Sequence, residues 1–192
     1  MRVFMIRHGQ TGRNKAFLLH GRTDDELNET GIEQAREASG LFKSAGIVFD
    51  KVCSSPLKRA IQTAEIISDC VPIIDERLIE MDYGPFEGTD LTNLPPDLKF
   101  FFSDFVHNPA PEGMESLESV VDRSGDFLED LKKCTGCNNI LISTHAITMK
   151  GLLEYLTPGS NGSYWSKNLG NCEIYTTSLL HDRTYDLPRN WK

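Results

Sequence analysis

The sequence predicts an α/β protein in which a mostly parallel central sheet is flanked by helices. Short runs rich in β-branched and aromatic residues alternate with longer segments of helical period. Such alternation is typical of a sheet buried between two layers of helices. The 192 residues, 39% of them apolar, are enough for one domain with a sizeable core and too few for two ordinary ones. We therefore expect a three-layer sandwich formed by a single domain over residues 1–192.

Five short segments are predicted to be strands from their composition and from the turn residues beside them. They are residues Arg2 to Ile6, Lys51 to Cys53, Pro72 to Ile74, Asn139 to Ser143 and Glu173 to Thr177. In open α/β sheets, ligands bind beyond the carboxyl ends of the strands. Residues that directly follow these segments are therefore the first candidates for a functional site.

Two helices are predicted in the first half of the chain. Thr30 and Glu33 form a capping-box pattern, and Gly46 is expected to end the helix that follows. Ser55 and Pro56 are expected to begin the second helix, as its N-cap and first helical residue. The predicted buried stripes are Ile32, Ala35, Phe42 and Ala45 in the first helix and Leu57, Ala60, Ile61 and Ala64 in the second.

A third helix is predicted over about residues 116–133 and a fourth after His145. Residues 84–111 differ from the rest, because prolines and aromatic residues surround a short amphipathic turn. We interpret this stretch as an insertion near the functional site, and a simple contribution of its phenylalanines to the core is an equal alternative. The apolar residues concerned are Leu117, Val120, Val121, Leu128 and Leu131, then Met149, Leu152, Leu153 and Leu156, and in the insertion Leu98, Phe101, Phe102 and Phe105.

The composition excludes several classes of function. A net charge of −8 argues against non-specific binding to nucleic acid or to an anionic membrane. The apolar run Val3 to Ile6 is too short for a signal peptide or a membrane span. Five cysteines are too sparse for a disulfide framework and fit a reducing cytoplasm. Cys134 and Cys137 have metal-like spacing, but nothing nearby completes a four-ligand site, so we expect a turn there.

Two histidines follow predicted strands and mark a candidate anion site. His8 comes after the first strand and His145 after the fourth. Arg7 and Asn14 would supply a charged fork and an amide donor beside His8. Gly9 and Gly12 are expected to let backbone N–H groups approach an anion closely.

Arg59 strengthens this interpretation because it breaks a local rule. With Lys58 it lies in the first turn of the second helix, where the helix dipole disfavours cations by about 0.3–1 kcal/mol. Exceptions of this kind are often functional, and an arginine there would reinforce an anion site that the free N–H groups begin. The alternative is a pair of solvated cations on a surface turn.

The sequence resembles the histidine phosphatase (phosphoglycerate mutase-like) superfamily over nearly its whole length. Several spaced motifs in the expected order make the resemblance specific. They are Arg7-His8-Gly9-Gln10-Thr11 with Asn14; Gly21 with Asp24 and Leu27; Ser54 to Ala60 with Thr63; Glu80 with Gly84, Glu87 and Gly88; and Ser143-Thr144-His145.

The resemblance implies a phosphoglycerate mutase-like fold and roles for five catalytic residues. His8 would attack phosphorus and carry a phosphohistidine, while Arg7, Arg59 and His145 would hold the phosphoryl oxygens. Glu80 would protonate the leaving alkoxide and later deprotonate the attacking water, with Asp82 as the fallback acid. Neither a metal nor a cofactor is expected.

The same resemblance implies a second group of residues that bind substrate. Arg22 departs from the tryptophan that is frequent in the family, so it is expected either to reach a second anionic group or to pair with Asp24 or Asp25. Met114, in Pro111 to Ser116, displaces a family glycine and leaves local contacts open. The expected substrate-binding residues are Thr11, Asn14, His20, Gly21, Arg22, Tyr83 and Ala146.

We interpret the chain as a phosphatase that acts on a small phosphorylated metabolite. A cofactor-dependent phosphoglycerate mutase is the nearest alternative, but residues 84–111 carry four acidic residues and only Lys99 to hold a bisphosphate. A catalytically inactive module that binds a phosphorylated ligand is the other alternative. A homodimer and phosphoprotein substrates stay open at this stage.

Overall fold

The computed structural model describes residues 1–191 and contains a six-stranded sheet in the order β3-β2-β4-β1-β5-β6. Strands β3, β2, β4 and β1 are mutually parallel, and β5 and β6 are antiparallel to their neighbours. The prediction of a mostly parallel sheet is confirmed. The strands are β1 Arg2–Arg7, β2 Lys51–Ser54, β3 Ile73–Ile74, β4 Asn139–Thr144, β5 Ile174–Ser178 and β6 Arg189–Asn190.

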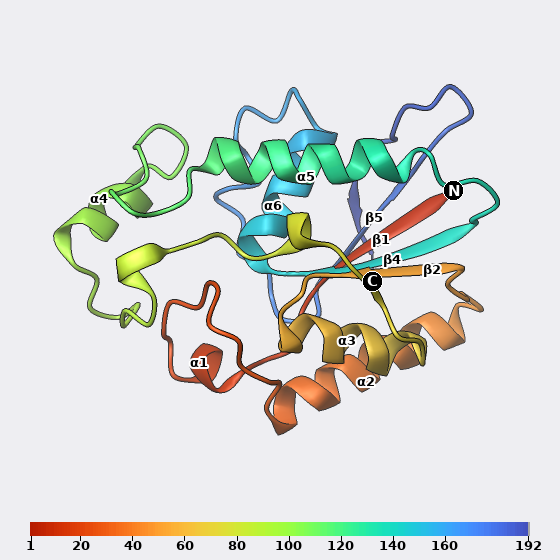
Figure 1. Ribbon diagram of the computed structural model, residues 1–192, viewed down its shortest axis with the longest axis horizontal. Helices are drawn as coiled ribbons and strands as arrows, with labels where there is room; N and C mark the ends of the chain where they lie inside the picture. Colours follow the sequence, from red (N-terminus) through yellow and green to blue (C-terminus); the bar gives the residue numbers. More distant parts are fainter. Residues whose placement is uncertain (192) are drawn as a thin grey trace.

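Helices cover both faces of the sheet, with α5 and α6 on one side and α2 and α3 on the other (Figure 1). Alternate residues of β1 explain this arrangement, because Val3 and Met5 pack with the first pair of helices and Phe4 and Ile6 with the second. The predicted three-layer sandwich is confirmed. The helices are α1 Gly12–Lys15, α2 Glu29–Ser44, α3 Lys58–Ser68, α4 Pro96–Ser103, α5 Leu117–Leu131 and α6 Ala146–Leu156, and the 3₁₀ turns are η1 Glu76–Leu78 and η2 Gly84–Phe86.

The predicted start of the first long helix is wrong by two residues. Asn28 is the N-cap of α2, and its side chain accepts a hydrogen bond from the N–H of Gly31 at 2.8 Å. Thr30 lies inside the helix, because the side chain of Asn28 already caps it two residues earlier. Gly46 follows the helix with a φ of +64°, as predicted, and Ala45 is exposed and does not join the buried stripe.

The predicted start of the second helix is also wrong. Helix α3 begins at Lys58, with Leu57 as an N-cap that makes no side-chain capping bond. The Ser55 hydroxyl is used elsewhere, as described below, and it accepts only the N–H of Leu57 at 3.3 Å. The third predicted helix, over about residues 116–133, is α5, and Ser116 caps it by accepting the N–H of Ser119 at 3.1 Å.

The segment 84–111 joins an apolar cluster beyond the ends of the strands, together with residues of other segments such as Leu19, Val120, Ile147 and Trp165, and α4 lies at its outer edge (Figure 1). Leu98 and Phe101 are fully buried in this cluster, whereas Phe102 and Phe105 are half-buried at its surface. Leu98 and Phe101 thus complete a core, as the alternative expected, and Phe102 and Phe105 line a surface hollow. The interpretation of residues 84–111 as an insertion near the functional site stays a prediction.

Three further observations bear on the functional classes. The residues Cys134 to Cys137 lie in the connection between α5 and β4, as predicted, and their thiols are free. Within residues 1–191, no group of three or more His, Cys, Asp or Glu side chains has the geometry of a metal site. None of the helices described here combines the length and apolarity needed to cross a membrane.

Candidate active site

The two predicted histidines meet at the carboxyl ends of β1 and β4. These strands pair in parallel with Arg7 opposite Thr144, so the residue that follows each strand reaches the same edge of the sheet. The ring centroids of His8 and His145 are 5.1 Å apart, and both side chains are buried. Strand register alone thus brings together residues 137 positions apart, which the resemblance had predicted.

His8 is held as a neutral imidazole with a defined tautomer. Its Nδ1–H donates to the carbonyl oxygen of Gly9 at 2.7 Å, so Nε2 carries the lone pair. Burial, followed by the positive charges of Arg59 and Arg7, holds the pKa of His8 well below its usual 6.5. A neutral Nε2 at the floor of the site is the chemical form that a nucleophile needs.

Arg59 lies directly against this nitrogen. Its Nε donates to His8 Nε2 at 3.2 Å, and its two terminal nitrogens donate to the carbonyl oxygens of Thr23 at 2.8 Å and Gly21 at 2.5 Å. The side chain is 0% exposed, so the alternative of a solvated surface cation is wrong for Arg59. Burial lowers its pKa to about 10, which still leaves it charged at neutral pH.

Arg7 supplies a second buried guanidinium. One of its terminal nitrogens donates to the carbonyl oxygen of Leu169, which anchors the side chain in a distant loop. Its Nε is buried and has no hydrogen-bond partner among the described residues. Unpartnered buried donors are costly, so this N–H indicates a place for an acceptor supplied by a ligand.

His145 offers a second unpartnered donor. The buried Ser55 hydroxyl accepts the N–H of Leu57 and lies 2.7 Å from Nε2 of His145, so donation to Nε2 is the arrangement that gives the hydroxyl proton an acceptor. Burial, and then the charges of Arg59 and neighbouring groups, holds the pKa of His145 well below 6.5, so the ring is neutral. Its remaining proton is therefore on Nδ1, a buried atom without a partner in the described structure.

Glu80 is held at the start of α6. Its carboxyl oxygens accept the N–H groups of Met81 at 2.9 Å, Thr148 at 3.1 Å and Ile147 at 3.2 Å. The last two are N-terminal donors of α6, which have no intrahelical partner. Ala146 opens the same helix, next to His145, so its N–H is a further donor at this edge. The structure thus places Glu80 and Ala146 beside the histidine pair.

Thr11, Asn14 and His20 form a layer around the site and bond mainly to one another. Thr11 caps the short helix α1, where its hydroxyl accepts the N–H of Asn14 at 3.2 Å, and its own N–H donates to Asn14 Oδ1 at 3.2 Å. The Nδ1 of His20 lies 3.2 Å from the Thr11 hydroxyl, and its ring centroid is 6.4 Å from that of His8. The predicted residues are near the nucleophile.

Gly21 and Tyr83 are packed tightly at the entrance. The N–H of Gly21 donates to both oxygens of Glu87, at 2.9 and 3.1 Å, and its carbonyl oxygen receives Arg59. A Cβ at Gly21 would come within 2.7 Å of the carbonyl oxygen of Met81 and of the Tyr83 ring. Both polar groups of Gly21 are therefore engaged within the protein, and its small size is what the site requires.

Arg22 does not pair with Asp24 or Asp25, so that alternative is wrong. Its guanidinium lies 3.0 Å from Asp82 and 3.4 Å from Glu115. Asp24 instead accepts the N–H of Lys58 at the start of α3, and Asp25 pairs with Arg13. The side chain of Arg22 is 42% exposed, so it lies at the rim and its reach to a substrate stays a prediction.

The role predicted for Gly9 is also wrong. Its N–H donates to the Thr63 hydroxyl at 3.0 Å and is not directed at an anion. A Cβ at Gly9 would lie 2.4 Å from the carbonyl oxygen of Gly31, so the glycine is needed for the close approach of this loop to α2. Gly12 is exposed, and nothing lies within 4 Å of the position of its missing Cβ.

Comparison with known proteins identifies the family to which this arrangement belongs. The family model of the histidine phosphatase superfamily (branch 1) matches residues 3–188. The chain belongs to the histidine phosphatase superfamily. The family model covers more than nine-tenths of the sequence. Membership of the histidine phosphatase superfamily also agrees with the fold and with the order of the sequence motifs.

Both phosphatases and mutases are found among the related histidine phosphatases. The adenosylcobalamin/alpha-ribazole phosphatase of Salmonella typhimurium is 30% identical over 86% of this chain and 84% of its own length. A 2,3-bisphosphoglycerate-dependent phosphoglycerate mutase of Parvibaculum lavamentivorans is 32% identical over 80% of this chain and 79% of its own.

Solved structures also resemble this histidine phosphatase. A phosphoserine phosphatase variant of Entamoeba histolytica, in complex with phosphoserine, is 28% identical, with a TM-score of 0.83 that covers 100% of this chain and 95% of that one. The same organism's phosphoserine phosphatase in complex with 3-phosphoglyceric acid is 29% identical, with a TM-score of 0.81. The phosphoglycerate mutase-like fold predicted from the motifs is confirmed.

Several residues of the site were not predicted individually. Thr148 donates its hydroxyl to the carbonyl oxygen of Ile79 at 2.5 Å and its N–H to Glu80, so it fixes the Glu80 loop on α6. Its position three residues after His145 was the available signal. The carbonyl oxygen of Leu169, which anchors Arg7, has no signal in the sequence because any residue carries one.

Proposed function

We propose that this protein is a phosphomonoesterase that transfers a phosphoryl group first to His8 and then to water. The observation that carries the proposal is the pair of buried, unpartnered donors, Arg7 Nε and His145 Nδ1, beside a neutral His8. Positively charged and hydrogen-bonding groups of this kind can bind the equatorial oxygens of the phosphoryl group in the transition state of its transfer.

In the first step, the lone pair on His8 Nε2 attacks phosphorus as the ester P–O bond breaks. Arg7, Arg59 and the Nδ1–H of His145 hold the three phosphoryl oxygens, while Glu80 in its protonated form gives a proton to the leaving alkoxide. The bond of Nδ1–H to Gly9 keeps the attacking nitrogen pointed at the site. The products are the free alcohol and a phosphohistidine.

In the second step, water attacks the phosphorus of the phosphohistidine, and the P–N bond breaks. The Glu80 carboxylate takes a proton from that water, which restores its protonated form, and phosphate leaves His8 in its neutral form. Arg59 Nε donates to His8 Nε2 at 3.2 Å and would turn onto the phosphoryl oxygens when the substrate binds.

A phosphoglycerate mutase remains the second candidate, because one relative named for that activity is 32% identical. A mutase would return the phosphoryl group from His8 to a second hydroxyl group, whereas a phosphatase gives it to water. The acidic balance of residues 84–111, with Lys99 as the one basic residue, favours water and a small monophosphate over a bisphosphate.

The deciding experiment measures phosphate release from a panel of phosphomonoesters, including 3-phosphoglycerate, by wild type and His8→Ala. We expect turnover by wild type and a loss of at least about 10⁴-fold in the variant, whose circular dichroism should match wild type. Rapid quenching with a radiolabelled ester should trap an acid-labile, base-stable label on wild type only. Conversion of 3-phosphoglycerate to its isomer without phosphate release would support the mutase, and no turnover would support an inactive binding module.

Independence from metal ions is a separate prediction. Activity should persist in EDTA, and vanadate, which mimics a five-coordinate phosphoryl group, should inhibit strongly. Loss of activity in EDTA, restored by a divalent cation, would overturn the mechanism in which arginine and histidine side chains alone stabilise the transition state.

A further inference from the structure

Lys150 on α6 is a partly buried cation without a carboxylate partner. Its Nζ donates to the carbonyl oxygen of Trp165 at 2.8 Å and lies 5.8 Å from the centre of the Phe105 ring. In the described part of the chain, no Asp or Glu oxygen lies within 4.0 Å of this nitrogen. An ammonium carries three donors, and a buried charge is costly unless it is paired. Lys150 therefore has donors to spare for an anion.

The position of Lys150 ties it to the phosphate site. It follows Ala146 by four residues on the same helix, a rise of about 6 Å, and helical side chains lean toward the N-terminus. Ile147, one turn before Lys150 on the same helix, donates its N–H to Glu80 at 3.2 Å. The loop that accepts its hydrogen bond at Trp165 also anchors Arg7 through Leu169.

Lys150 also lines a hollow of about 460 Å³ between α6 and the insertion. Half-buried aromatic residues of the insertion form the opposite wall, and Ile147, which donates its N–H to Glu80, forms the edge nearest the catalytic acid. Through its backbone N–H, one lining residue of the hollow, Ile147, thus directly contacts the group that would protonate the leaving alkoxide. Its lining residues include Phe102, Asp104, Phe105, Ile147, Lys150 and Trp165.

We propose that Lys150 is a specificity-determining residue whose ammonium binds a carboxylate on the leaving-group side of the substrate. The proposal rests on the phosphomonoesterase function above and names its substrate class, a small phosphorylated carboxylic acid. The bond to Trp165 fixes one donor and leaves two for the carboxylate oxygens. The hollow accommodates the carbon chain between the two anionic groups, with its aromatic wall as the apolar side.

The charges that face Lys150 determine how its binding depends on pH. Burial lowers the pKa of Lys150 to about 8, the negative charge of Glu80 opposes this shift, and Arg7 adds to it. Asp104 also lines the hollow, but it is engaged by His107 at 2.9 Å. The ammonium is charged below pH 8 and loses its proton above it, so the preference for a carboxylate should weaken as the pH rises through about 8.

The test compares two substrates that differ only at the carbon that bears the carboxylate. In 3-phosphoglycerate this carbon is a carboxylate, and in glycerol 3-phosphate it is a hydroxymethyl group. Phosphate release should give wild type a higher kcat/KM for 3-phosphoglycerate. In Lys150→Gln, which retains a donor for Trp165, the ratio of the two values should fall about 10- to 100-fold through KM. Lys150→Arg should restore most of the ratio.

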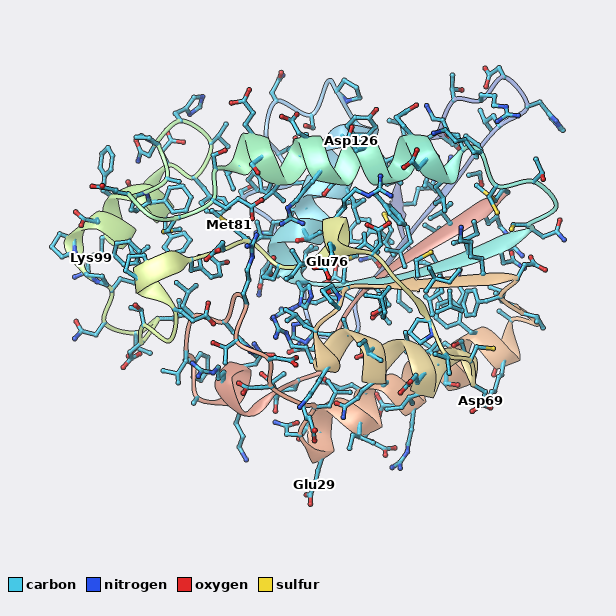
Figure 2. The ribbon with its side chains drawn as sticks, in the orientation of Figure 1. Glu29, Asp69, Glu76, Met81, Lys99 and Asp126 are labelled. Carbon is cyan, nitrogen blue, oxygen red and sulfur yellow. The ribbon has the colours of Figure 1, made fainter. Side chains whose placement is uncertain are left out.

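Lys99→Gln is the matched control, because it removes one positive charge from the exposed side of α4. Figure 2 shows Lys99 at the outer edge of the molecule, away from the labelled Met81 that follows Glu80. In Lys99→Gln, the ratio of kcat/KM for 3-phosphoglycerate to kcat/KM for glycerol 3-phosphate should equal that of wild type. An equal fall in kcat/KM for both substrates in Lys150→Gln would show that Lys150 only holds the Trp165 loop.

Two other outcomes would also count against the proposal. One is a wild-type ratio near one, which overturns the substrate class but leaves the phosphatase activity standing. The other is the absence of phosphate release from every phosphomonoester, which overturns the proposed function itself. The two failures are therefore separable in one set of assays.

Discussion

The phosphate site and the insertion are adjacent but differ in composition and burial. In the site, His8, Arg59 and Glu80 are buried and held by hydrogen bonds to the backbone or to one another. In the insertion, aromatic residues and carboxylates dominate, and Phe100 and Val106 are 58% and 41% exposed. The first region is formed by strand ends and helix starts, and the second by a segment that the sheet does not constrain.

This difference supports our proposal that the phosphate site carries the reaction and that the insertion, with Lys150, carries the selectivity. Two buried guanidinium groups are costly to desolvate, and a phosphate dianion offsets that cost only when every group is held in place. Rigid strand ends meet that requirement. Contacts to the remainder of a substrate need only shape and one well-placed charge, which the insertion and a single lysine on α6 can provide. Substitutions in the two regions should therefore have different signatures.

The largest effect is expected from Arg59→Ala in the phosphate site. Loss of the guanidinium removes charge from the transition state and leaves the carbonyl oxygens of Gly21 and Thr23 without their donor. We expect kcat/KM to fall about 10³-fold or more for every phosphomonoester, with retention of the fold checked by circular dichroism. Lys58→Ala, at the exposed neighbouring position, should change it less than about twofold; similar losses in both variants would show a general effect on α3.

The next largest effect is expected from Glu80→Gln, which tests the second function of the phosphate site. Poor alkoxide leaving groups require a proton, so kcat for an alkyl phosphate should fall about 10²- to 10⁴-fold. The loss for 4-nitrophenyl phosphate should be much smaller, because its leaving group is stable as an anion. Equal losses for both esters would remove Glu80 from the acid role, and Asp82→Asn would be the next variant to measure.

A smaller effect concerns the stability cost of the buried histidines. Burial, and then the charge of Arg59, lowers the pKa of His20 from 6.5 to about 4. Between these values the unfolded chain binds a proton that the folded protein does not. The free energy of unfolding should therefore fall with decreasing pH, by up to about 1.4 kcal/mol per pH unit for each such histidine.

Urea denaturation at several pH values between 7 and 4 measures this slope. His20→Gln should make it shallower, whereas His181→Gln, at an exposed position away from the site, should leave it as in wild type. If the free energy of unfolding has the same pH dependence in His20→Gln and wild type, burial of neutral His20 does not lower stability at acidic pH as predicted.

The smallest effect is expected in the insertion. Phe105→Ala removes part of the aromatic wall beside Lys150 without touching the phosphate site. KM for 3-phosphoglycerate should rise about three- to tenfold, and kcat should change less than about twofold. Steady-state kinetics measure both constants, and Phe100→Ala, on the exposed side of α4, is the control. A fall in kcat comparable to that of Glu80→Gln would end the separation of reaction from selectivity.

Much of the fold and the principal catalytic candidates could be predicted from the sequence because their signals are local. Composition and turn residues indicated five of the six strands, and apolar periodicity indicated α2, α3, α5 and α6, whereas β6 was not predicted. Chain position identified His8 and His145 as residues that follow parallel strands. Arg59 stood out because a cation in the first turn of a helix opposes the dipole. The motifs added Glu80, whose position no periodic pattern indicates.

Helix starts were less accurate, because several residues can cap a helix and only the surrounding packing selects one. Asn28, and not Thr30, caps α2. Ser55 does not cap α3, because its hydroxyl is hydrogen-bonded to His145. The pairing of Arg22 with Asp82, across 60 positions of sequence, was likewise decided by the meeting of two loops.

The sequence by itself determined the α/β class, the family and the residue types that meet a phosphoryl group, since each depends on local patterns or ordered motifs. Only the tertiary structure decided which nitrogen of each histidine carries the proton, because this depends on Gly9 and Ser55 as bonding partners. It alone also decided that Lys150 faces the insertion with no carboxylate oxygen of residues 1–191 within 4.0 Å of its Nζ, because such an absence depends on all the surrounding segments.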